Sequence, residues 1–220
     1  MILRIAEDAF VDEAGAPITL RGHDLALEQT PEGRPFPPEA AGELFAGLWA
    51  RGVNAVRLGI RHDCIEGPER GVWNEAYLAY LRQLLVRAAE TGGPETRGLA
   101  AFLVPLPAPV AGDTAAGASR AGAPGGAAQR EGFIAAYRHA ARRLKNCRAV
   151  TAWGVMGGRW PVWIPPREAD VFAAAFCARI REVYPAALFF AEQWPVPETA
   201  AARRLGLVPP PLLSGLFRPD

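Results

Sequence analysis

The chain has 220 residues, of which 50% are hydrophobic and 21% are charged, and its formal net charge is +1. This composition supports one substantial hydrophobic core and argues against a disordered chain. A near-neutral charge indicates no nucleic-acid partner, and the short basic group Arg142, Arg143 and Lys145 is interpreted as the solvated face of a helix.

The cysteines and the N-terminus bear on the compartment of the protein. Cys64, Cys147 and Cys177 are odd in number and lack ligand-like spacing, so the sequence predicts neither a metal site nor a cofactor. Residues 1–8 contain no apolar stretch long enough for a secretory signal, and no run in the chain approaches the length of a membrane span. The simplest interpretation is a cytoplasmic protein with reduced thiols, in which Cys177 packs on the apolar face of a helix.

The N-terminal segment predicts a small β-hairpin. Its two strands are expected at residues 3–6 and 17–20, around a turn at residues 12–15 that contains Asp and Gly. The β-branched residues Ile18 and Thr19 support the second strand.

Helices and strands alternate from residue 37 onward. Periodic apolar residues predict helices over 37–51, 75–91 (capped by Asn74), 129–145, 167–184 and 198–205, and apolar runs predict strands over 53–60, 99–106, 149–156 and 187–191. Such strands are buried on both faces, and the helices are long enough to be parallel crossovers. The pattern predicts an α/β fold of βα repeats, but it does not separate an open doubly wound sheet from a (β/α) barrel. No Gly-rich phosphate loop follows the first strand, which disfavours nucleotide binding.

Two stretches are expected to lack regular structure, within a single domain that spans residues 1–220. Residues 107–128 are rich in Ala, Gly and Pro and follow the third predicted strand, so we expect a flexible loop there. The tail from about residue 208 contains three consecutive prolines, which cannot continue a helix.

Four segments occur in the order that a known enzyme family shows. They are residues 12–25, with the run Leu20-Arg21-Gly22-His23-Asp24-Leu25, residues 48–78, with Gly52-Val53-Asn54-Ala55-Val56-Arg57-Leu58, and residues 152–160 and 180–190. In this order they resemble the retaining glycoside hydrolases of family 5, the cellulase and endoglycoceramidase group. The resemblance implies a TIM-barrel-like fold, here a partial barrel of about five βα units preceded by the hairpin, and activity on the O-glycosyl bonds of carbohydrates.

The chain departs from this family at the catalytic positions. In the family the fourth strand ends in Asn-Glu-Pro, whose Glu is the acid/base, and the resemblance places Gly157, Gly158 and Arg159 at these positions. A family histidine near the end of the third strand has no counterpart in residues 103–109. The family's nucleophilic Glu follows the seventh strand, whereas the predicted strands of this chain end at the fifth. Retaining hydrolysis needs two carboxyl groups about 5–5.5 Å apart, so we expect that hydrolysis has been lost.

Three charged residues are candidates for remaining roles. Glu192, just past the fifth strand, is a candidate for a replacement acid, although a hydrogen-bonded role at the rim is favoured. Glu66 matches a family position at which fixing a loop is the favoured role. The family arginine that matches Arg57 lies in the barrel mouth and orients the nucleophile. Because a nearly buried guanidinium needs a partner, we predict an ion pair between Arg57 and Asp24, which replaces a family Asn.

Substrate-binding candidates gather near the expected strand ends. They are Arg57, Asp24, His23, Trp153, Trp160 and Trp194. Aromatic rings at that end stack on sugars in a carbohydrate cleft, but these rings and Trp163 equally well fill the mouth of an incomplete barrel, and both interpretations stay open. His23 and His62, with Asp24 and Asp63, match no metal-ligand spacing.

Three functions follow. The favoured one is a glycoside-hydrolase-like protein that has lost catalysis and binds carbohydrate or a partner. The second is an active glycosidase completed by another chain or by a further C-terminal region. The third is an unrelated open-sheet protein, which a reversal of strand order would reveal. A partial barrel also leaves edge strands, so we expect a homodimer or a partner chain to cover them.

Overall fold

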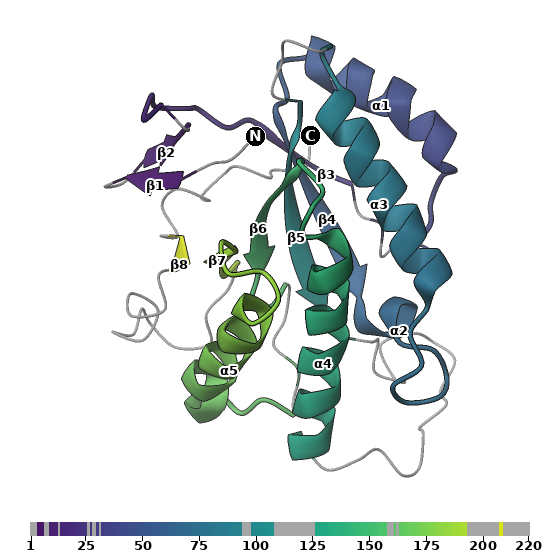
Figure 1. The fold of residues 1–220 in the computed structure, drawn as a ribbon, viewed down its shortest axis with the longest axis vertical. Helices are drawn as coiled ribbons and strands as arrows, with labels where there is room; N and C mark the ends of the chain where they lie inside the picture. The colour runs from purple at the N-terminus through teal and green to yellow at the C-terminus, as the bar shows by residue number, and fades with distance from the viewer. Residues whose placement is uncertain are drawn as a thin grey trace.

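Within the residues that the structure describes, a parallel sheet of six strands forms the centre of the computed structural model (Figure 1). The strands are Gly22–Asp24 (β3), Ala55–Arg61 (β4), Ala100–Leu106 (β5), Val150–Gly154 (β6), Leu188–Phe190 (β7) and Leu207–Val208 (β8). The described residues are 4–6, 9–12, 14–25, 27, 30, 32–93, 98–107, 126–157, 161, 163–192 and 207–208.

The strand order confirms the barrel-like interpretation. The sheet runs β3-β4-β5-β6-β7-β8, so each strand pairs in parallel with the next one in the chain. An open doubly wound sheet reverses its order at a switch point, and the described strands contain no such reversal. The predicted partial barrel of about five βα units agrees with this sheet. The further strand β8 was not predicted, because it has only two residues and shows no periodic pattern that sequence reasoning can detect.

Helices cover one face of this sheet, as Figure 1 shows. They are Pro38–Ala50 (α1), His62–Ile65 (α2), Glu75–Glu90 (α3), Gly126–Leu144 (α4) and Ala169–Arg181 (α5), the last preceded by the short 3₁₀ turn Pro166–Glu168 (η2). Asn74 caps α3 as predicted, because its side chain accepts a hydrogen bond from the Tyr77 amide at 3.0 Å. The helix α4 begins at Gly126, three residues before its expected start. Most of the loop expected at about 107–128 lies outside the described residues, as do the predicted helix at 198–205 and the tail from 209.

Strand residues alternate between two cores, one on each face of the sheet. The helix-facing core takes Val56, Leu58, Leu103, Trp153 and Phe189 from the strands. The opposite face carries a smaller cluster that consists of Phe10, Ala55, Ala100, Phe102, Val104, Ala152 and Phe190. The ring of Phe102 on β5 lies 5.6 Å from that of Phe190, which comes from β7, two strands away. This face is therefore the inner side of a curved sheet.

The N-terminal hairpin differs from its prediction in the second strand. Arg4–Ala6 (β1) pairs antiparallel with Ala9–Val11 (β2), and residues 17–20 contribute only an isolated bridge between Pro17 and Val11. The predicted turn at residues 12–15 is present, with Asp12 Oδ1 accepting hydrogen bonds from the amides of Ala14 and Ala16. The prediction failed because Phe10 buries its ring against Phe102, and this packing outweighs the β-propensity of Ile18 and Thr19.

The structure also bears on the sequence-based expectations about membrane spans and thiols. No helix in the described part of the chain is long and apolar enough to cross a membrane. Cys64, Cys147 and Cys177 are buried and form no disulfide, and Cys177 packs in the helix-facing core as predicted.

Candidate functional site

Arg57 lies on the inner face of the sheet between two carboxylates. Its Nη1 donates to Asp24 Oδ2 at 2.9 Å and to Oδ1 at 3.1 Å, which confirms the predicted ion pair. On its other side, Nη2 donates to Glu192 Oε2 at 3.0 Å and Nε donates to Oε1. Glu192 is hydrogen-bonded, as the rim interpretation expected, but the sequence did not identify Arg57 as its partner. We call Asp24, Arg57 and Glu192 the arginine cluster.

The curvature of the sheet assembles the arginine cluster. Asp24 ends β3 and is in register with Arg57 on the neighbouring β4, so their side chains lie on the same face. Glu192 follows β7, which is three strands away from β4 in the sheet order. A flat sheet would hold these strands too far apart for a bidentate contact, because neighbouring strands are spaced by about 4.8 Å. The cluster therefore sits inside the partial barrel, toward the carboxyl ends of its strands, where barrel enzymes carry their sites.

The arginine cluster is mostly withdrawn from solvent. The side chain of Arg57 is 10% exposed, that of Glu192 is 22% exposed and that of Asp24 is 33% exposed. One guanidinium faces two carboxylates, so the cluster carries a formal excess of negative charge. Both oxygens of Glu192 accept hydrogen bonds from Arg57, whereas a general acid must direct an O–H at the leaving group. The geometry thus suits the anchoring of polar groups better than proton transfer from Glu192.

Gly157 lies beside this cluster, in space that neighbouring side chains fill. A Cβ atom on Gly157 would lie 2.0 Å from Val104 Cγ1, 2.9 Å from Leu106 Cδ2 and 3.3 Å from Glu192 Oε2. The Gly157 amide also donates to the Pro105 carbonyl at 2.8 Å, which holds the backbone close to β5. The family Asn that the resemblance places here would therefore not fit. Gly158 and Arg159 lie outside the described residues.

Of the three tryptophan candidates, the structure describes Trp153, which does not lie at the cluster. Trp153 is fully buried in the helix-facing core, so it neither stacks on a sugar nor fills the mouth of the barrel. The physical reason is strand alternation, which turns Ala152 inward and Trp153 outward. The Trp163 ring packs 5.5 Å from that of Phe133 on α4. Trp160 and Trp194 lie outside the described residues.

The histidine candidates also lie apart from the cluster. His23 is in register with Val56, whose side chain belongs to the helix-facing core, so His23 points away from the face that carries Asp24. The ring of His62 on α2 stacks on Phe133 at 5.6 Å, and burial lowers its pKa. The described residues contain no group of three His, Cys, Asp or Glu side chains that could hold a metal ion.

Glu66 has the loop-fixing position that the sequence favoured. Its Oε1 accepts a hydrogen bond from the Gly71 amide at 2.6 Å, and its backbone forms a bridge with Trp73. The turn between them passes through Gly71 at φ +79°, a conformation that glycine adopts readily.

Comparisons with known proteins point to carbohydrate-active enzymes. No family model matches the chain. Among curated proteins, a glucosylceramidase from Cryptococcus neoformans is 38% identical over 92 residues, covering 34% of this chain and 12% of the relative. A second glucosylceramidase, from Rhizopus delemar, is 44% identical over 52 residues, covering 24% of this chain and 8% of the relative.

The solved structures cover more of the chain. Endo-glycoceramidase II from a Rhodococcus species superimposes on 82% of this chain with a TM-score of 0.63 at 20% identity. The catalytic domain of an endoglucanase from Thermobifida fusca covers 88% of it with a TM-score of 0.55 at 14% identity. The chain has the fold of the family 5 glycoside hydrolases. The resemblance carried by the four sequence segments is therefore confirmed at the level of the fold. This chain covers about half the length of the two solved structures, 51% and 54%.

Proposed function

We propose that this chain is a glycoside-hydrolase-fold protein that binds a carbohydrate at the arginine cluster and does not hydrolyse it. The observation that carries the proposal is the filled space beside Gly157, where Val104 and Leu106 occupy the place of a side chain. In family 5 enzymes the corresponding strand end presents the acid/base, and the sequence has Gly158 at that position. A glycine can neither protonate a leaving oxygen nor activate water.

The binding part of the proposal rests on the arginine cluster. Asp24 and Glu192 offer carboxylate oxygens that accept hydrogen bonds from sugar hydroxyls, and Arg57 fixes both of them in place. The similar proteins bear names that point to glycosylceramides and cello-oligosaccharides. A β-glucosyl group is therefore the ligand that we propose for this site.

Titration calorimetry with cellobiose and with the soluble headgroup lactose tests the binding. We expect binding to the wild type and a roughly tenfold weaker affinity for Asp24→Asn, because a hydrogen bond to a charged group contributes about 1.5–3 kcal/mol. Glu39→Asn, on the exposed surface of α1, is the matched control and should leave the affinity unchanged. Absence of binding to both sugars, or equal affinities for the two variants, would count against the proposal.

Hydrolysis of an aryl β-glucoside tests the lost catalysis. We expect no release of phenol above background, and none from Gly158→Glu, since a retaining mechanism needs a second carboxylate as nucleophile. Robust release by the wild type would refute the proposal.

An active glycosidase is the second candidate, and the position of Glu192 favours it. Its carboxylate is the one that follows β7 on the inner face, near the strand ends where a barrel carries its catalytic groups. If the wild type releases phenol and Glu192→Gln lowers the rate by about 10²–10⁴, the range of general acid–base catalysis, this candidate replaces the first.

A further inference from the structure

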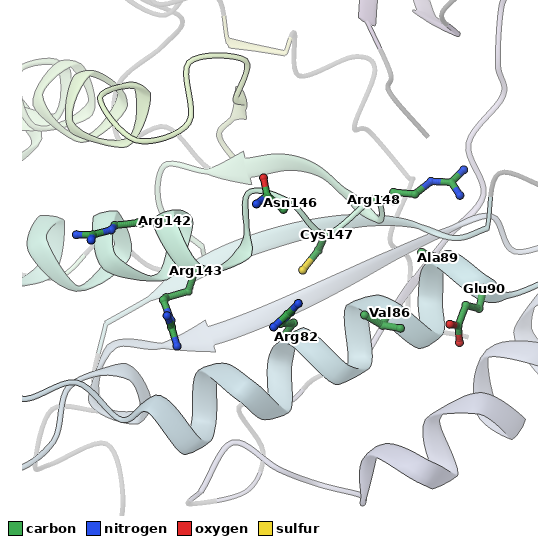
Figure 2. Close-up of a pocket in the computed structure, with 9 residues that line it drawn as sticks. All are labelled: Arg82, Val86, Ala89, Glu90, Arg142, Arg143, Asn146, Cys147 and Arg148. Carbon is green, nitrogen blue, oxygen red and sulfur yellow. The ribbon is translucent and has the colours of Figure 1, made fainter.

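A cavity on the outer surface forms a second candidate binding site, between α3 and α4 (Figure 2). Its volume is about 530 Å³, and it is lined by Arg82, Val86, Ala89, Glu90, Arg142, Arg143, Asn146, Cys147 and Arg148. Residues 146–148 directly precede β6, so the cavity lies toward the amino ends of the strands. It is thus separate from the arginine cluster, which lies toward their carboxyl ends. We call it the α3–α4 pocket.

Cationic groups dominate the lining of the α3–α4 pocket. Four of the nine lining residues are arginines, and Glu90 is the only acidic one among them. Glu90 is itself engaged by Arg87, a residue outside the lining, at 3.3 Å. Arg143 keeps an ion pair with Glu75 at 2.8 Å through one of its terminal nitrogens, Nη2, and its other donors remain available to a ligand. The pocket therefore presents an excess of positive charge around a concave surface.

The two helices supply this charge by their spacing. Arg82 and Val86 are four residues apart on α3, so they lie on one helix face, and Arg142 and Arg143 lie in the last turn of α4. Figure 2 shows Arg82 and Arg143 directed into the same gap from opposite helices, with Cys147 above Arg82 in this view. Arg82 is distant in sequence from Arg142 and Arg143, which is why the sequence alone indicated only a solvated helix face.

The floor and wall of the α3–α4 pocket are neutral. Cys147 is 9% exposed, and burial raises the pKa of its thiol, so it adds no negative charge near neutral pH. Val86, which is 41% exposed, provides an apolar wall. A volume of this size falls in the range of small-molecule sites, about 300–1,000 Å³. Guanidinium groups form paired hydrogen bonds with phosphate oxygens.

We propose that the α3–α4 pocket binds a phosphate group, held by Arg82 and Arg143, with Arg142 and Arg148 at the rim. The phosphate belongs either to a small phosphorylated molecule or to a lipid headgroup, and the chemistry of recognition is the same for both. This site is independent of the carbohydrate binding proposed above.

Calorimetry with inorganic pyrophosphate and co-sedimentation with vesicles test the proposal. The vesicles contain phosphatidylcholine alone or phosphatidylcholine with phosphatidic acid. We expect wild-type binding to at least one phosphate source, and a loss of about tenfold or more in Arg82→Gln/Arg143→Gln, since each charged hydrogen bond contributes substantially. Higher ionic strength should weaken the binding.

The control variant is Arg51→Gln/Arg138→Gln. It removes the same charge from exposed positions, and Arg138 is ion-paired with Glu182 as Arg143 is with Glu75. Pyrophosphate binding without sedimentation assigns the pocket to a small molecule, and sedimentation that Arg82→Gln/Arg143→Gln abolishes assigns it to a lipid headgroup. Binding to neither source, or an equal loss in the control, overturns the proposal.

Discussion

Arg57 is the residue on which both carboxylates of the arginine cluster depend. It donates to Asp24 and to Glu192, and its own side chain is 10% exposed. Removing the cation leaves two carboxylates close together in a poorly solvated space. Breaking a buried pair in this way costs more than the pair contributes, because the remaining charge loses its compensation.

Arg57→Met is therefore expected to lower the free energy of unfolding by about 2–4 kcal/mol, somewhat less than for a fully buried pair because Asp24 is partly exposed. Asp24→Asn, which keeps the shape and the amide oxygen as an acceptor, should cost about 1 kcal/mol. Urea denaturation followed by tryptophan fluorescence measures both. Arg51→Met at the exposed end of α1 is the control, and an Arg57→Met variant as stable as this control would contradict the expectation.

His62 gives the chain a dependence of stability on pH. Burial lowers its pKa, the carboxylate of Glu66 raises it, and Arg70 lowers it. Between the lowered pKa and about 6.5, the unfolded state holds a proton that the folded state does not. The free energy of unfolding should therefore rise with pH in this window, with a slope of at most about 1.4 kcal/mol per pH unit, and stability should fall as the pH drops below about 6.5.

His62→Gln should remove this part of the slope in urea denaturation between about pH 5 and pH 7, even if the variant is less stable at every pH. Glu66→Gln is a second variant, which shifts the pKa of His62 without removing its ring. It removes a carboxylate that raises the pKa of His62, so the slope should extend to lower pH. A His62→Gln variant with the slope of the wild type would show that other groups cause the dependence.

Sequence reasoning at the residue scale succeeded for neighbours and failed for distant pairs. The Arg57–Asp24 pair was predictable because the two residues end up on adjacent strands and Asp24 adds a charge that the family lacks. The contact with Glu192 was not, because it depends on how far the sheet curves between β4 and β7. The position of Trp153 depends on which strand face turns inward, and an apolar strand buried on both faces gives no signal for that.

At the scale of elements, the segment after β6 passes so close to β5 that a Cβ atom at position 157 would clash with the side chains of Val104 and Leu106. We expect Gly157→Ala to lower the free energy of unfolding by about 1–3 kcal/mol, the cost of overpacking, because its Cβ would lie 2.0 Å from Val104 Cγ1. Val104→Ala removes that atom, so the penalty for Gly157→Ala should shrink in this background. Urea denaturation of the four variants of this double-mutant cycle measures the coupling.

Gly47 provides the contrasting control. It lies inside α1, and a Cβ there would meet nothing within 4 Å. Gly47→Ala should raise the free energy of unfolding by about 0.5–1 kcal/mol, because alanine is the better helix former. If Gly157→Ala proves as stable as Gly47→Ala, the side chains of Val104 and Leu106 do not fill the space beside the cluster.

Elements with a long periodic pattern were the ones that the sequence predicted well. The helices α1, α3 and α5 begin within about two residues of their expected positions, and the strands β4 and β5 match closely. The short helix α2 and the strand β8 have too few residues for a period to show. The predicted partner strand of β1 was the wrong one. Local β-propensity favoured residues 17–20, whereas the burial of Phe10 and Val11 decides which segment pairs with β1.

At the scale of the whole molecule, the hairpin and the sheet share one core. Phe10 on β2 belongs to the inner cluster with Ala100 and Phe102, while Ile18 and Leu20 pack at its border. Ala100 begins β5, so the hairpin packs against the inner face of the sheet from the amino end of that strand. The homodimer or partner chain expected over the sheet edges stays a prediction, which analytical ultracentrifugation checks.

Phe10→Ala tests whether the hairpin is an integral part of the barrel. Phe10 is 4% exposed, and its ring meets that of Phe102 edge-on at 6.1 Å, so its removal opens a cavity at the floor of the inner cluster. We expect the free energy of unfolding to fall by about 3 kcal/mol, with fluorescence and circular dichroism reporting one coincident transition. Val171→Ala, at a site 71% exposed, should change it by less than about 0.5 kcal/mol. A Phe10→Ala variant as stable as Val171→Ala would mean that the hairpin only rests on a barrel that folds without it.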